Sequence, residues 1–128
     1  MEINQITSEI INKSINVHRT LGPGLLESAY KECLCFELIK SGLYVEKEKA
    51  LPLIYEDVKL DCGYRIDIMV ENKVIIEVQS VETLIDIHMV QILTYLKLAN
   101  CKIGLLINFN VELLKHGIKR CINKYYTL

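Results

Sequence analysis

Two strand-like segments with only three residues between them constrain the fold of this chain most strongly. Tyr64–Val70 and Val74–Gln79 are rich in β-branched residues, and Glu71-Asn72-Lys73 separates them. Such a short polar connection predicts an antiparallel β-hairpin. If all three polar residues form the loop, the facing pairs along the rest of the hairpin are fixed.

The predicted register sets two acidic side chains against each other. Asp67 faces Glu77, and Arg65 faces Gln79 two residues further from the loop. Alternation places Arg65, Asp67 and Met69 on one face of the first strand. Facing side chains have Cβ atoms about 4.5–5.5 Å apart, so the two carboxylates repel each other. A divalent cation with oxygen ligands would offset this repulsion.

Other arrangements of the two acids need no metal. One carboxyl group with a raised pKa would also relieve the repulsion. A register that differs by one residue, or acids that face solvent, would remove it. The hairpin alone therefore leaves metal binding as one of several interpretations.

The segments before the hairpin predict two helices and two strands. Apolar spacing indicates a helix over Ile3–His18, and a second helix follows the turn Gly22-Pro23-Gly24 and ends before Gly42. Tyr44–Leu51 and Pro52–Val58 are then expected to pair as antiparallel strands.

The segments after the hairpin complete the predicted fold. Thr83–Ala99 is expected to be helical, with Asp86 completing a capping box. Lys102–Phe109 indicates a strand buried on both faces, and Val111–Leu128 a short helical or turn segment followed by one short element. The order predicts a single α/β or α+β domain over residues 1–128, with a central mixed sheet flanked by helices.

The charge balance limits how the chain could bind a nucleic acid. The 128 residues carry 15 Lys and Arg against 16 Asp and Glu, a formal net charge of −1. This balance argues against binding through bulk charge. No acid follows Glu112, and the tail carries four basic residues, which are Lys115, Lys119, Arg120 and Lys124. The tail is either a modest basic patch or a solvated surface that balances the acidic hairpin.

Other features of the sequence bear on the compartment. No apolar run approaches the roughly 20 residues of a membrane span, and the N-terminus lacks the pattern of a signal peptide. The five cysteines are an odd number without metal-ligand spacing, so we expect reduced thiols that pack in the domain, in the cytoplasm.

Two helices carry polar side chains at helical spacing. His88, Gln91 and Tyr95 fall at i, i+3 and i+7, and such a row beside an acidic hairpin could touch a phosphate, a base or a metal-bound water. A solvated face is the alternative interpretation. Glu27 and Tyr30 lie at i and i+3 near the start of the second helix, where an acid commonly serves only the helix dipole.

At this point the sequence resembles a known family. Gly24-Leu25-Leu26-Glu27-Ser28-Ala29-Tyr30 matches the G-x-x-E-x-x-Y signature of the GxxExxY family, a branch of the PD-(D/E)XK nuclease superfamily. The preceding segment from Val17 to Pro23 and the later segment from Leu105 to Phe109 are also similar, and the resemblance covers nearly the whole chain. It implies a restriction-endonuclease-like core.

The resemblance also implies roles for individual residues. Asp67 resembles the metal-binding aspartate of the motif, and Glu77 the acid of its E-x-K element. Glu27 resembles the helix acid that contributes to the metal site in several branches. Gln91 and Tyr95 match a Q-x-x-x-Y element that lies beside the nucleic acid and the active site. Mg²⁺ or Mn²⁺, held by the hairpin acids, would activate a water for attack on a phosphodiester.

One position departs from the motif. Gln79 stands where the family has a lysine, and Gln has neither its charge nor a titratable proton. Gln79 could still orient water or substrate, and Arg65, which faces it in the predicted register, could restore charge. Arginine does not act as a general base, so we expect weakened or metal-dominated chemistry.

The leading interpretation is a metal-dependent nuclease-like protein that hydrolyses DNA or RNA phosphodiesters. Its expected catalytic residues are Asp67, Glu77, Gln79 and Glu27, and its expected substrate-binding residues are Gln91, Tyr95, Arg65, Tyr30 and His88. We expect weak, metal-assisted affinity for the nucleic acid, and a homodimer is compatible with the sequence. The competing interpretations are a catalytically degenerate nuclease fold that binds nucleic acid or protein, and a structural dimerisation module.

Overall fold

The structure is a computed structural model that describes all 128 residues. Its elements follow one another along the chain in the order α1 (Ile3–Leu21), α2 (Glu27–Lys40), β1 (Val45–Ala50), β2 (Leu53–Tyr55), β3 (Val58–Leu60), β4 (Arg65–Val70), β5 (Val74–Gln79), α3 (Asp86–Ala99), β6 (Ile103–Asn108), the 3-10 turn η1 (Leu114–His116) and β7 (Ile118–Ile122). This confirms the α+β class predicted from the sequence.

Five strands form one mixed sheet in the order β1-β4-β5-β6-β7. Only β5 and β6 run parallel, since α3 crosses over between them, and the other neighbours are antiparallel. Val70 pairs with Val74 across the β4–β5 turn, so the predicted three-residue loop is confirmed. Glu71 and Asn72 in this loop have positive φ angles, which suit a tight hairpin turn.

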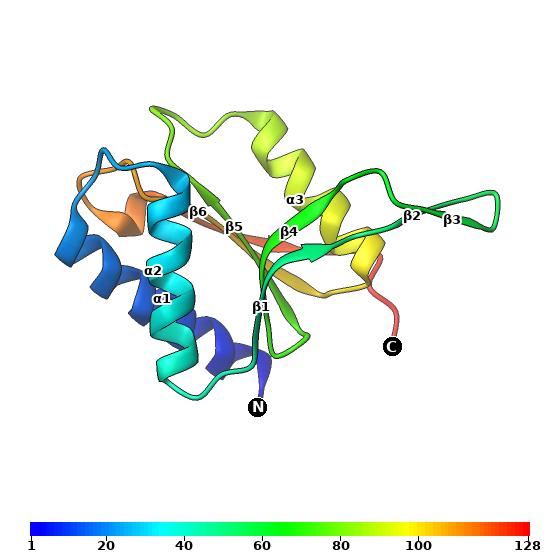
Figure 1. Cartoon of the computed structure of the whole chain (residues 1–128), viewed down its shortest axis with the longest axis horizontal. Helices are drawn as coiled ribbons and strands as arrows, with labels where there is room; N and C mark the ends of the chain where they lie inside the picture. Colours follow the sequence, from blue (N-terminus) through cyan, green and yellow to red (C-terminus); the bar gives the residue numbers. More distant parts are fainter.

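Helices cover both faces of the sheet and create two separate hydrophobic clusters (Figure 1). The first cluster lies under α1 and α2 and includes Ile68, Ile76 and Phe109. The second lies under α3 and includes Met69 and Ile75. All six residues of β6 are buried, as predicted, because the strand has helices over both faces.

The region between α2 and β4 folds differently from the prediction. The expected antiparallel partners do not pair with each other, because β1 pairs with β4 instead. The segment that follows Pro52 forms β2 and β3, a separate two-stranded arm that projects from the domain (Figure 1). Proline has no N–H to donate, so the sheet hydrogen bonding of β1 ends there. The arm exposes Ile54, Tyr55 and Val58.

The ends of the chain agree with the prediction in outline. The tail contains the short helical turn η1 and a last short element, β7, which extends the sheet. α3 begins at Asp86 rather than Thr83, so the predicted capping box is wrong. The N-terminus of α3 is instead closed by His88, whose Nδ1 accepts a hydrogen bond from the Ile85 amide at 2.9 Å.

The cysteines are all free, but they do not all pack in the domain. Cys35, Cys101 and Cys121 are buried and Cys33 is half-buried, whereas Cys62 is exposed. The expectation that all five are packing residues is therefore wrong for Cys62. Among the helices, none combines the length and apolar character that a membrane crossing requires.

Candidate functional site

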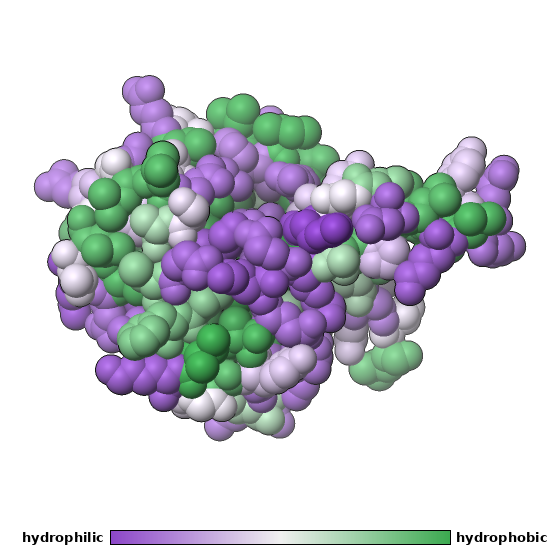
Figure 2. Space-filling view, in the orientation of Figure 1, coloured by the Kyte–Doolittle hydropathy of each residue, from purple (hydrophilic) through white to green (hydrophobic).

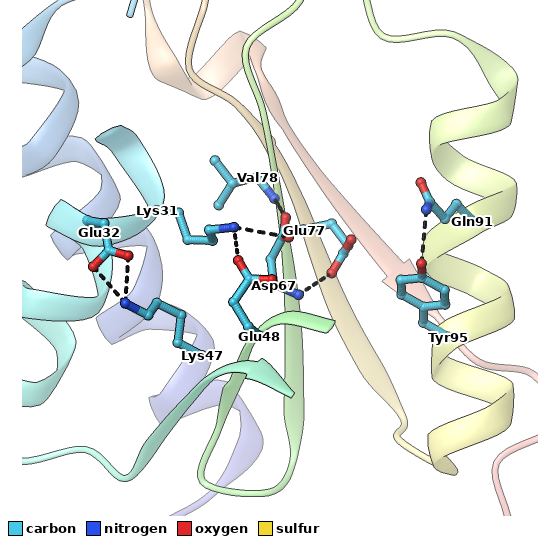
Figure 3. A network of polar contacts seen from close by, with 9 residues as sticks. All are labelled: Lys31, Glu32, Lys47, Glu48, Asp67, Glu77, Val78, Gln91 and Tyr95. Atoms are coloured by element: carbon cyan, nitrogen blue, oxygen red, sulfur yellow. Dashed lines mark hydrogen bonds and ion pairs between the residues drawn. The ribbon is translucent and has the colours of Figure 1, made fainter. Parts of the chain in front are cut away.

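The site is built where the β4–β5 hairpin opens. Backbone pairing between these strands extends from the turn only as far as Ile68 and Ile76. Beyond them, the amide of Asp67 donates a hydrogen bond to Glu77 Oε2 at 2.9 Å, and the amide of Val78 donates one to Asp67 Oδ2 at 2.8 Å. The two acids meet as the predicted register requires, and their side chains replace the backbone ladder at this end (Figure 3).

The opening is accompanied by a break in the alternation of β4. Ile66 belongs to the cluster under α3 together with Met69, whereas Ile68 belongs to the cluster under α1 and α2. The carboxylate of Asp67 lies near α2, within 3.7 Å of Lys31 Nζ. The prediction that Asp67 and Met69 share a face is therefore wrong.

The residue of β1 opposite Asp67 explains this break. Lys47 pairs with Ile68 and Lys49 pairs with Ile66, while Glu48 between them makes no ladder pair. Glu48 has φ +54°, a left-handed conformation that a glutamate rarely adopts. The strained backbone turns Glu48 toward Lys31, to which its carboxylate is hydrogen-bonded. Strain of this kind is characteristic of functional positions.

Burial gives the two hairpin acids unusual proton affinities. Glu77 is only 5% exposed. Burial, and then repulsion from Asp67, raises the pKa of Glu77 to about 8. Burial also raises the pKa of Asp67, although the Val78 amide and Lys31 act in the opposite direction. A pair of carboxylates that resists double ionisation is a pair that a cation would stabilise.

The donor set fits a hard divalent cation. One oxygen of each hairpin carboxylate is held by a backbone amide, and the other oxygens, Asp67 Oδ1 and Glu77 Oε1, accept no hydrogen bond. Oxygen ligands of this type suit Mg²⁺ or Mn²⁺. Nowhere in the chain do three His, Cys, Asp or Glu side chains come together in an arrangement that could hold a metal ion. The protein therefore offers a pair of ligands, and Glu27 does not join them as a third.

Charged side chains of α2 and β1 surround this pair. Lys31 contacts both Glu48 and Asp67, and Lys47 is paired with Glu32 at 2.6 Å. Figure 2 shows hydrophilic surface across the middle of this face, where α2 and β1 lie. Sequence reasoning missed Lys31 and Glu48. The i+4 spacing could have placed Lys31 on the same helix face as Glu27, and so near the site. No sequence signal predicts the backbone conformation of Glu48.

Two residues of α3 approach from the opposite side, and they share a helix face as their spacing predicted. Gln91 Nε2 donates a hydrogen bond to the Tyr95 hydroxyl at 3.0 Å. Tyr95 packs edge-on against Tyr64, and its pKa is raised by burial and by the charges of the hairpin acids. Tyr95 therefore borders the acidic pair, whereas the ring of His88 is hydrogen-bonded to the backbone at the start of α3.

Tyr30 has a structural place in the fold. It is fully buried, stacks on Phe109 at 4.6 Å, and donates a hydrogen bond to the carbonyl of Gly22 at 2.5 Å. The same hydroxyl accepts one from the Leu25 amide at 3.1 Å. Tyr30 thus fixes the loop between α1 and α2 and has no surface for a substrate, contrary to the expected contact. Glu27 directly follows this loop and is the first residue of α2.

Arg65 does not lie where the sequence predicted. The ladder ends before reaching it, so it does not face Gln79. Arg65 pairs with Ala50 of β1, and its guanidinium reaches Asp61 at 3.4 Å. The hairpin therefore gains no positive charge from Arg65 to replace that of the motif lysine.

Polar residues that sequence reasoning missed hold the end of β5 in place. Asn108 is buried, and its side-chain amide both accepts from and donates to the backbone of Val81. Ser80 Oγ donates to the carbonyl of Leu25 at 2.5 Å, which ties the end of β5 to the start of α2. These bonds fix Gln79 and Glu77 relative to Glu27.

The basic residues of the tail do not form one patch. Arg120 turns toward α1, where it donates hydrogen bonds to Asn4 and Thr7. Its neighbour Cys121 faces the other side of the sheet, in the cluster under α3. Arg120 is thus drawn away from the other tail lysines, which favours the solvated-surface interpretation of the tail over a single basic patch.

The fold and the site define the class of protein: a mixed sheet between helices, with a carboxylate pair where a central hairpin opens. The family described as the PD-(D/E)XK nuclease superfamily matches residues 4–121. The chain therefore belongs to this superfamily and is nuclease-like. No curated protein and no solved structure significantly matches the chain.

Proposed function

We propose that this protein is a divalent-metal-dependent nuclease of the GxxExxY branch, which hydrolyses DNA or RNA phosphodiesters. The observation that carries the proposal is the pair of opposed, buried carboxylates at the open end of the β4–β5 hairpin. Membership in the nuclease superfamily supports it. The five free cysteines support a reducing compartment such as the cytoplasm.

Four residues of the chain have distinct roles in the proposed hydrolysis. Asp67 and Glu77 would hold Mg²⁺ or Mn²⁺ through Oδ1 and Oε1, the oxygens that their backbone bonds leave available. When bound, the ion supplies an activated water and neutralises charge that develops on the phosphate. Glu27 lines the hollow beside Lys31, where it would accept a hydrogen bond from a water rather than bind the ion. Gln79 orients water or substrate by hydrogen bonding, since it cannot take up a proton.

The α3 side of the site orients the substrate. The hydrogen bond from Gln91 fixes the hydroxyl of Tyr95, which is then directed as a donor to a phosphate or an ordered water. Tyr95 is only 5% exposed, so its position is set by packing before any ligand arrives. Preorganised donors of this kind stabilise charge without reorganisation during the reaction.

The test combines metal binding with cleavage. Mg²⁺ and Mn²⁺ are titrated by calorimetry into the wild type and Asp67→Ala, and both proteins are assayed on single-stranded, duplex and branched DNA and RNA. We expect binding and cleavage by the wild type and loss of both in the variant. Metal binding that survives the loss of Asp67 would refute the site, and a wild type that binds metal but cleaves nothing would refute the enzymatic function.

A further inference from the structure

The proposed site lacks a positive charge on its own hairpin. Gln79 is neutral, and Arg65 is directed toward Asp61. The transition state of phosphodiester hydrolysis gains negative charge, and a cation beside it contributes strongly to the rate. A positive charge at this site must therefore come from another element of the fold.

Lys31 of α2 is the cation that reaches the hairpin acids. Its Nζ lies 3.7 Å from Asp67 Oδ1, and its side chain is 17% exposed. A lysine side chain is an ammonium ion at neutral pH, and the carboxylates of Glu48 and Asp67 lie beside this one. An ammonium group has three donors, of which Glu48 accepts one. Asp67 Oδ1 lies 3.7 Å from the same group, so one donor remains available to an incoming oxygen atom.

Lys31 also lines a surface hollow that is large enough for a phosphate. The hollow, of about 430 Å³, is lined by Leu25, Leu26, Glu27, Ser28, Lys31 and Ser80. It lies between the first turn of α2 and the residue that directly follows Gln79. The helix N-terminus adds a favourable field for an anion to the charge of Lys31. The hollow thus extends from Lys31 to Ser80, the residue that follows the position of the motif lysine.

We propose that Lys31 supplies, from α2, the positive charge that Gln79 cannot provide, and that it contacts the phosphate undergoing hydrolysis. Glu48 is its positioning residue, because the strained backbone of β1 brings the Glu48 carboxylate onto the ammonium group (Figure 3). This inference rests on the proposed nuclease function. It assigns to the nuclease a substrate-contacting residue that lies outside the hairpin motif.

Three variants test the assignment by cleavage. Removal of one transition-state donor typically lowers kcat about 10²–10³-fold, and we expect this loss for Lys31→Met. Lys31→Arg retains part of the activity, because it keeps the charge. Adding Gln79→Lys to Lys31→Met restores cleavage toward the wild-type rate, since the charge returns at the motif position. The matched control is Lys47→Met, which removes a lysine of the same surface that pairs with Glu32 and leaves kcat unchanged.

Two binding measurements separate a phosphate contact from a structural role. Calorimetric titration with Mn²⁺ should show equal or tighter binding to Lys31→Met, because the variant lacks a cation that competes for Asp67. Binding of a phosphorothioate oligonucleotide, which resists cleavage, should lose about 0.7–0.9 from its log–log salt slope, the value for one phosphate contact. Lys47→Met should keep the wild-type slope.

Each outcome decides between the proposals. If Lys31→Met cleaves as the wild type does, or loses Mn²⁺ binding together with cleavage, the role of Lys31 is refuted while the nuclease function stands. If the wild type cleaves no substrate, the nuclease function is refuted. In that case, the salt slope alone decides whether Lys31 contacts a phosphate, and an unchanged slope refutes that contact.

Discussion

The two ends of the β4–β5 hairpin use the same pair of strands in opposite ways. Near the turn, Val70, Met69 and Ile68 pair with their partners through the backbone, and all of these side chains are buried and apolar. At the far end, Asp67 and Glu77 take over the hydrogen bonds of the ladder. The closed end stabilises the fold, whereas the open end frees carboxylate oxygens, contains buried acidic groups and lies beside the strained backbone of β1. A short hairpin can thus separate stability from chemistry along its length.

The largest expected effect is on cleavage, at the open end. Glu77→Gln removes a metal ligand but keeps a side-chain oxygen that can accept the Asp67 amide. We expect a fall in kcat of at least about 10²-fold, as for loss of a main electrostatic contribution, and weaker Mn²⁺ binding by calorimetry. Denaturant unfolding at pH 8.5 should show a variant as stable as the wild type or more so. A variant that retains the wild-type rate would contradict the division between the two ends.

The closed end should respond in the reverse manner. Ile76→Ala truncates a fully buried side chain, and we expect the free energy of unfolding to fall by about 2–5 kcal/mol. The folded fraction should still bind Mn²⁺ with the wild-type affinity, since the carboxylates are unchanged. Urea unfolding and calorimetry measure the two quantities. Loss of metal affinity in folded Ile76→Ala would show that the two ends are coupled.

The pH dependence of stability isolates Glu77. Its pKa is about 8 in the folded chain and near 4.5 when unfolded, so between these values the folded state binds more protons. Stability of the protein in EDTA should therefore fall as pH rises from 5 to 8, by about 1 kcal/mol per pH unit. Urea unfolding across this range gives the slope. Glu77→Gln should remove most of it, and an unchanged slope in the variant would assign the titration elsewhere.

The smallest effect concerns the strain beside the open end. Glycine accepts the positive φ of Glu48 without steric cost, so Glu48→Gly should stabilise the fold by about 0.5–1 kcal/mol. Because the variant also frees Lys31, cleavage should decrease despite the gain in stability. Unfolding and kinetic assays on the same preparation measure both changes. A loss of stability would mean that the contact between Lys31 and Glu48 outweighs the strain.

Local patterns predicted the parts of this protein that depend on neighbouring residues. Loop length and alternation placed Asp67 opposite Glu77, and a continuous apolar run identified β6 as a buried strand. Helical spacing placed Gln91 beside Tyr95. In these cases the residues that determine the geometry lie within a few positions of each other, so their spacing is sufficient.

The parts that were missed depend on partners distant in the chain. The face of Asp67 is set by the strained conformation of Glu48, a residue of another strand, and the surroundings of Asp67 by Lys31 of α2. Arg65 was expected opposite Gln79 because the ladder was assumed to continue, but the carboxylates end it. The hydroxyl of Tyr30 suggested substrate binding. In the fold it donates a hydrogen bond to the carbonyl of Gly22, and the ring stacks on Phe109.

The substitution of carboxylates for carbonyls in the ladder makes two backbone amides natural reporters. The protons of Asp67 and Val78 point at Glu77 Oε2 and Asp67 Oδ2, whose electron density changes when either acid gains a proton or a cation. In an NMR spectrum of the ¹⁵N-labelled chain, these two cross-peaks should move with pH and with added Mg²⁺, while those of Met69 and Ile75 stay nearly fixed. Amide hydrogen exchange should likewise be faster at the first pair than at the second. The chemistry of the site can thus be followed through the main chain, without a substrate.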